Sequence, residues 1–93
     1  MHQLQSESLD RLFDTIMKLE SREECYRFFE DLCTVKELQD LGQRLDVAVL
    51  LNQGVNYTAI SQQVNVSTAT ISRVSKCLNY GSGGYRQALE RMK

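Results

Sequence analysis

The chain of 93 residues contains no proline and only five glycines. It therefore lacks the turn residues that separate the many short strands of an all-β sandwich. Its longest unbroken aliphatic run, residues 47–51, is far shorter than the ~20 apolar residues that cross a membrane. No apolar segment follows Met1 as it would in a secretory signal. We expect neither an all-β protein nor a membrane protein, and the length fits a single domain over residues 1–93.

Cysteine and histidine are also scarce. The three cysteines are Cys25, Cys33 and Cys77, and the single histidine is His2. An odd number of cysteines without a disulfide-framework spacing predicts reduced thiols in a cytoplasmic protein. These few ligands do not make a metal site, and Cys77 has no histidine partner nearby in sequence that would activate it as a nucleophile. We therefore expect no metal, no cofactor and no enzymatic activity.

Acidic residues are almost absent from the second half of the chain. Up to Asp46 there are eleven acids and six bases, a net charge of −5, whereas residues 47–93 hold one acid, Glu90, and five bases, a net charge of +4. A segment that approaches phosphates is expected to lack carboxylates in this way. The alternative is a polar surface, rich in Ser, Thr, Asn and Gln, that binds no nucleic acid.

Apolar residues recur at helical spacings of three and four along the chain. The pattern predicts helices near residues 9–19, 25–33, 35–53, 58–64, 67–79 and 85–92. Two capping boxes, Ser21-Arg-Glu-Glu24 and Thr34-Val-Lys-Glu37, start the second and third helices, and Gly54 ends the third. The fold class is therefore all-α, with about six helices. The first three carry wide apolar faces, which either fill one core or interlock with a second copy; the small size favours the second copy.

The residues at 57–79 fit a helix-turn-helix, in which two short helices pack at a steep angle through a tight turn. Such a pair needs apolar residues at fixed places, a small residue where the second helix presses on the first, and a turn residue that tolerates positive φ. Ser61 and Asn65 occupy the last two places. The apolar places are filled by Ile60, Val64, Val66, Ile71 and Val74. The alternative is an ordinary helical hairpin.

The same register predicts which side chains of the second helix point outward. Small polar residues let a helix enter the major groove, hydroxyls bond phosphates and base edges, and Arg73 can pair with a guanine or a phosphate. Without DNA, Arg73 would be a surface ion-pair residue and Ser67 only a helix cap. The residues that we assign to DNA contact are Thr58, Ser67, Thr68, Ala69, Thr70, Ser72, Arg73 and Lys76.

Three segments resemble the Trp repressor family. These are Thr34-Val-Lys-Glu-Leu-Gln-Asp-Leu-Gly-Gln-Arg44, Ala69-Thr-Ile-Ser-Arg73 and, similar to the TrpR-related YerC/YecD branch, Cys77-Leu-Asn-Tyr-Gly-Ser-Gly-Gly-Tyr85. The resemblance implies an all-helical, intertwined homodimer whose recognition helices read half-sites ~34 Å apart. It also implies a ligand slot between the long helix and the recognition helix, touched by Thr34, Arg44 and Arg73.

The sequence departs from the family at this slot. Val74 stands where the family has a glycine that makes room for an indole ring, and Cys77 stands where the family has a hydroxyl. Valine adds volume and a thiol is a weak donor. Overpacking costs ~1–3 kcal/mol, so we expect tryptophan not to be the co-repressor. A different effector, touching Thr34, Arg44, Arg73, Val74 and Cys77, or none, is expected instead.

The sequence thus predicts a transcriptional repressor that binds double-stranded DNA at a palindromic operator as a homodimer. A small-molecule effector can gate it. The alternative is a helix-turn-helix used for contact with another protein, because Thr68, Ala69 and Ser72 suit a protein interface as well as DNA and the basic residues are few.

Overall fold

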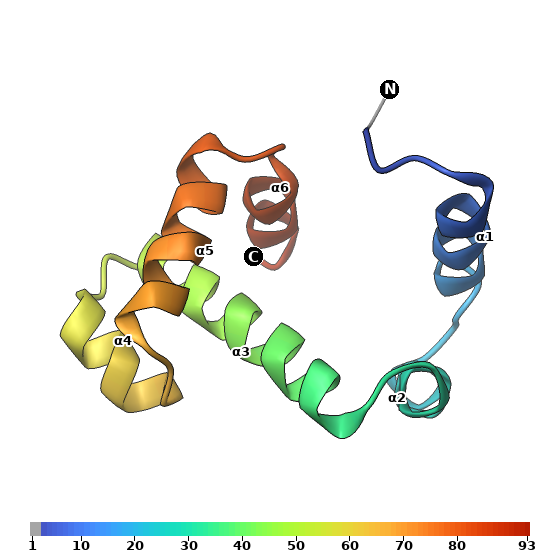
Figure 1. Cartoon of the computed structure of the whole chain (residues 1–93), viewed down its shortest axis with the longest axis horizontal. Helices are drawn as coiled ribbons and strands as arrows, with labels where there is room; N and C mark the ends of the chain where they lie inside the picture. Colours follow the sequence, from blue (N-terminus) through green and yellow to red (C-terminus); the bar gives the residue numbers. More distant parts are fainter. Residues whose placement is uncertain (1–2) are drawn as a thin grey trace. The chain divides into compact units, whose positions relative to one another are not determined.

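The computed structural model describes residues 3–93, and within them every regular element is a helix (Figure 1). This confirms the all-α fold and all six predicted helices, each to within three residues at either end. The helices are α1 (Glu7–Ile16), α2 (Arg22–Leu32), α3 (Val35–Asn52), α4 (Tyr57–Val64), α5 (Thr68–Tyr80) and α6 (Gly84–Arg91). Among the described residues, no helix is long and apolar enough to cross a membrane.

The chain divides into two compact units, the first ending at Val35 and the second beginning at Lys36. In the first unit, serine side chains start both helices. The Ser6 hydroxyl accepts from the Leu9 amide at 3.1 Å, and the Ser21 hydroxyl accepts from the Glu24 amide at 3.1 Å. The predicted box at Ser21 differs in one bond. The Glu24 carboxylate accepts at 3.3 Å from the amide of Glu20, the residue before the cap. It therefore binds the end of the segment that connects α1 to α2.

The first unit contains no buried side chain among its described residues. Phe13 is 54% exposed, Met17 80% and Tyr26 60%, although both helices have a distinct apolar face. In a single chain α1 and α2 therefore contribute no buried side chain to a core, and the favoured alternative, in which a second copy covers them, stays a prediction. Both α1 and α2 have an apolar face, but no part of the first unit buries either face.

The core lies in the second unit, where α4, α5 and α6 gather around the C-terminal half of α3 (Figure 1). Val47 and Ala48 of α3 are fully buried, as are Ile60 of α4 and Ile71 of α5. Leu89 attaches α6 to the same cluster with 7% of its surface exposed. The C-terminal end of α3 is therefore the support on which the other three helices are mounted.

Residues in left-handed or tight backbone conformations set the helix ends of this unit. Gly54, two residues after the end of α3, has φ of +82°, as predicted for a residue that ends the helix. Asn56 then caps α4, its side-chain oxygen accepting from the Ala59 amide at 2.9 Å. The segment between the helices predicted at 67–79 and 85–92 is shorter in the structure, because α5 continues through Tyr80 and α6 begins at Gly84.

Candidate nucleic-acid interface

Helices α4 and α5 form the predicted helix-turn-helix. Ile60 and Ile71 are fully buried, and Val74 is 2% exposed. The other two apolar places, Val64 and Val66, are partly buried and pack against the core. These five side chains hold the two helices to each other and to α3, because each apolar place faces the shared cluster.

The two steric places of the motif are occupied as predicted. Asn65 adopts φ 60° and ψ 52°, the left-handed conformation that asparagine tolerates better than most residues. Ser61 is half-buried, and its hydroxyl donates to the carbonyl oxygen of Val66 at 2.7 Å. A larger residue at Ser61 would displace the turn, so the small residue has a steric and a hydrogen-bonding role.

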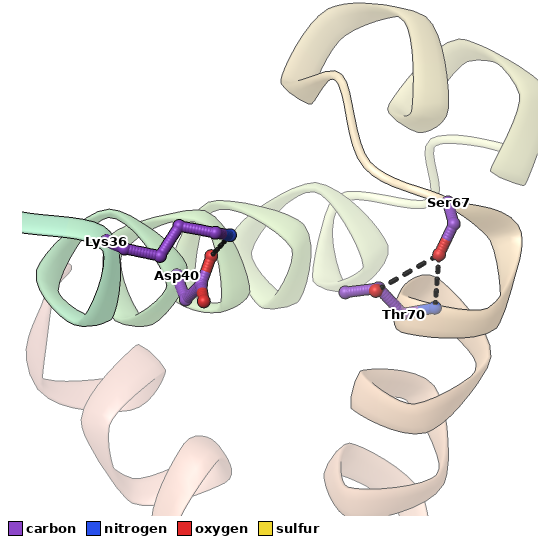
Figure 2. A network of polar contacts seen from close by, with 4 residues as sticks. All are labelled: Lys36, Asp40, Ser67 and Thr70. Carbon is purple, nitrogen blue, oxygen red and sulfur yellow. Dashed lines mark hydrogen bonds and ion pairs between the residues drawn. The ribbon is translucent and has the colours of Figure 1, made fainter.

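Ser67 starts α5 and fixes the side chain one turn later. Its hydroxyl accepts from the Thr70 amide at 3.2 Å, and the two hydroxyl oxygens lie 3.2 Å apart (Figure 2). Thr70 is half-buried, unlike the other residues assigned to DNA contact. Its hydroxyl lies beside that of Ser67, whereas Ala69 and Ser72 are exposed.

The outer face of α5 is polar, basic and free of carboxylates. No acidic residue occurs in α4 or α5. A surface depression of about 430 Å³ lies over this face, lined by Ala69, Thr70, Ser72, Arg73 and Lys76. The residues assigned to DNA contact that are exposed are Thr58, Ser67, Thr68, Ala69, Ser72, Arg73 and Lys76. The face can approach a polyanion without like-charge repulsion.

A second pocket, of about 330 Å³, separates α3 from α5. Its lining residues are Lys36, Asp40, Gln43, Arg44, Asn65, Val66, Thr70, Arg73 and Val74. Lys36 and Asp40 form an ion pair at 2.8 Å along α3 (Figure 2), which leaves Arg44 and Arg73 as the unmatched charges of the pocket. Such a pocket suits an anionic group, because guanidinium groups bind carboxylates by paired hydrogen bonds.

The candidate effector residues are only partly brought together here. Arg44, Arg73 and Val74 line the pocket, and Val74 forms its floor because the side chain is buried in the core. Cys77, one turn further along α5, is exposed and is not a lining residue. Thr34 belongs to the first unit. The effector contacts of Cys77 and Thr34 therefore stay predictions.

Six lining residues were not among the predicted effector contacts, and the three on α3 are Lys36, Asp40 and Gln43. They are separated from one another by four and three residues, and Gln43 is followed by Arg44. This spacing places them on one face of α3, so the helical periodicity around Arg44 contained the signal.

The scarce sulfur and imidazole groups do not form a site among residues 3–93. Cys25 and Cys33 are half-buried rather than fully buried, and no group of three His, Cys, Asp or Glu residues there is placed to hold a metal ion. His2 lies outside the described residues.

Comparisons with known proteins place the chain in a family. The model of the family described as Trp repressor protein matches residues 7–93. The uncharacterized protein YerC of Bacillus subtilis (strain 168) is 53% identical over 90 residues, which cover 97% of this chain and 86% of that protein. The crystal structure of a candidate Trp repressor from Staphylococcus aureus is 52% identical, with a TM-score of 0.93 over 99% of this chain and 95% of that one. A TrpR-like protein from Eubacterium eligens ATCC 27750 is 43% identical, also with a TM-score of 0.93, over 96% and 92% of the two chains. With the helix-turn-helix in place and the match extending over nearly the whole sequence, the chain belongs to the Trp repressor family.

Proposed function

We propose that this protein is a sequence-specific transcriptional repressor that reads a palindromic operator as a homodimer. The observation that carries the proposal is the outer face of α5. It joins exposed hydroxyls to Arg73 and Lys76, it contains no carboxylate, and its inner face is fixed to the core by Ile71 and Val74. Membership of a family of DNA-binding regulators supports the same function.

The exposed apolar faces of the first unit support the homodimer. Phe13, Tyr26 and Leu32 are each at least half exposed in the single chain, although α1 and α2 are amphipathic. Large exposed apolar surfaces mark interaction sites in soluble proteins. In the proposed dimer a second copy covers them, so that residues 1–93 form one Trp-repressor-like domain only as a pair of chains.

The pocket between α3 and α5 supports gating by a small molecule. Arg44 and Arg73 line it, and Arg73 also belongs to the DNA-facing surface, so a ligand here would act on a residue that reads DNA. Val74 occupies the space that the indole of tryptophan would need. The proposed effector is therefore a different anionic molecule.

The proposal is tested by selecting bound duplexes from a random DNA library with the purified protein, with and without L-tryptophan. We expect one palindromic motif with half-site centres about 34 Å apart, enriched equally in both arms. Enrichment only with tryptophan would contradict the role given to Val74. If no motif appears with or without candidate metabolites, the function fails and the protein-contact alternative replaces it.

The substitution Arg73→Ala tests the assigned residue directly. It should weaken binding to the selected operator by ~1–3 kcal/mol and, if Arg73 contacts a phosphate, lower the salt slope by about 0.9. Arg22→Ala removes an exposed arginine from the start of α2 and serves as the matched control. Equal affinities of the two variants would exclude Arg73 from the interface.

A further inference from the structure

Arg86 of α6 is the one basic side chain in the second half of the chain whose guanidinium is bound on three sides by the described residues. Its Nε donates to the carbonyl oxygen of Leu78 at 3.2 Å. One terminal nitrogen donates to the side-chain oxygen of Asn52 at 3.2 Å, and the other to that of Asn79 at 3.0 Å. The first of these bonds is partly buried. Arg86 is in no ion pair with a residue that the structure describes.

The three acceptors belong to the ends of two helices. Asn52 is the last residue of α3, while Leu78 and Asn79 lie in the last turn of α5. The Leu78 carbonyl is among the four that have no partner within their own helix. A cation at these C-terminal ends also opposes the negative ends of two helix dipoles. Arg86 therefore connects the end of α5 to the end of the helix on which α5 is mounted.

The acceptor on α5 is itself fixed. The side-chain nitrogen of Asn79 donates to the carbonyl oxygen of Ser75 at 2.9 Å, one turn earlier, so its oxygen is turned toward Arg86. A lysine could supply the charge at this place but not the planar fork that reaches three acceptors at once. The geometry thus depends on the guanidinium group.

The orientation of α5 governs where its first residues meet DNA. At 1.5 Å per residue, Ser67 lies about 16 Å along the axis from Leu78, so a tilt of ~10° about Leu78 displaces Ser67 by about 3 Å. Hydrogen bonds to base edges are lost at such displacements, since they need separations near 3 Å. Contacts to phosphates tolerate more, because they are dominated by charge.

We infer that Arg86 is a positioning residue for DNA reading: it sets the tilt of α5 and thereby the specificity of binding, without contacting DNA. This inference rests on the proposed function. It differs from direct contact, in which Arg86 would neutralise a phosphate and contribute to the salt slope. It also differs from a purely stabilising role, in which any substitution that destabilised the second unit equally would lower specificity equally.

The test compares the full-length variants Arg86→Gln and Arg91→Gln, which remove one positive charge from the same helix. Arg91 is exposed, and its side chain makes no hydrogen bond or ion pair with the residues described. Affinity for the selected operator and for a scrambled duplex is measured across a salt series. For Arg86→Gln we expect operator affinity to fall about tenfold, the equivalent of 1.4 kcal/mol, with scrambled-duplex affinity and salt slope equal to those of Arg91→Gln.

A third variant separates positioning from stability. Val47→Ala leaves a cavity in the core at a fully buried residue of α3 and removes none of the three hydrogen bonds of Arg86. Well below its melting temperature, it should keep the wild-type ratio of operator to scrambled affinity. A lowered ratio in Val47→Ala, an unchanged ratio in Arg86→Gln, or a salt slope lower by about 0.9 in Arg86→Gln would each overturn the inference.

Two further measurements distinguish a failure of this inference from a variant that does not fold and from a failure of the proposed function. If Arg86→Gln does not fold, Asn52→Ala removes only the bond to α3, and an unchanged affinity ratio in that variant overturns the inference. Hydrogen exchange of the last amides of α5 requires no DNA, and the exchange should be about tenfold faster in Arg86→Gln than in Arg91→Gln. If wild-type protein enriches no duplex, the proposed function fails, whereas equal exchange rates refute the connection made by Arg86.

Discussion

Replacing Val74 by glycine should convert this protein into one that tryptophan stabilises. Val74 is 2% exposed and forms the floor of the pocket that Arg44 and Arg73 line. Removing its side chain costs the ~1.5–3 kcal/mol that a buried aliphatic side chain contributes. Glycine in place of valine inside α5 costs roughly a further 0.3–0.5 kcal/mol of helix propensity. The total is about 2–3.5 kcal/mol.

The variant should still fold, because domains of this size are stable by ~5–14 kcal/mol. Its melting temperature should fall by about 8–28 °C, at 4–8 °C per kcal/mol for a chain of this length. Tryptophan at a hundred times its dissociation constant would restore ~2.7 kcal/mol by binding the folded state alone. The assay is thermal unfolding followed by circular dichroism over a tryptophan titration.

The matched control is Val47→Ala, which destabilises the same core from α3 without opening the pocket. We expect tryptophan to raise the melting temperature of Val74→Gly, and to leave the wild type and Val47→Ala unchanged. Stabilisation of the wild type would show that Val74 does not exclude the indole ring. Equal stabilisation of both variants would show binding elsewhere in the molecule.

Three further substitutions test the turns and the exposed apolar faces. Asn65→Ala should destabilise the protein by ~1–2 kcal/mol in urea unfolding, because Asn65 is left-handed, whereas Asn65→Gly should be nearly neutral; equal effects would contradict a steric role for the turn. Gly81→Ala should lower the free energy of unfolding by ~1–3 kcal/mol, because the added Cβ would collide with the carbonyl oxygen of Cys77. Gly84→Ala is the control and should not destabilise the protein, because its Cβ would meet only the Ser82 hydroxyl, at 3.9 Å. Phe13→Glu should convert the proposed dimer to a monomer in light scattering at micromolar concentration, because Phe13 is 54% exposed in the single chain; an unchanged mass would exclude this face from the interface.

Local features of the fold were predictable because neighbouring residues determine them. Ser67 caps α5, Asn65 turns the chain and Gly54 ends α3, each through a bond or a dihedral angle within four residues. The register of α5 follows from the same periodicity, so its exposed and buried faces were correctly distinguished. Periodicity of this kind predicts the direction of a side chain relative to its own helix axis. It does not predict which other helix that side chain contacts.

Contacts between different helices were harder to predict from the sequence. The bond from Arg86 to Asn52 joins residues 34 positions apart, and neither residue is in a pattern that indicates the other. Cys77 was assigned to the effector slot only through the family resemblance; it is exposed and does not line the pocket between α3 and α5, so its contact with an effector stays a prediction. The direction in which α5 crosses α3 decides that outcome, and packing in three dimensions determines the direction.

The apolar faces of α1 and α2 show the same limit in another form. Their periodicity correctly indicated which side chains avoid water, but periodicity does not say which chain covers them. The structure places every buried side chain among the described residues in the second unit, which also carries the outer face of α5 and the pocket of Arg44 and Arg73. In the proposed dimer the division follows function: the second unit reads DNA, while the first unit pairs two such readers. Substitutions in the first unit should therefore change the oligomeric state and the spacing of half-sites bound, and those on α5 should change the sequence read within each half-site.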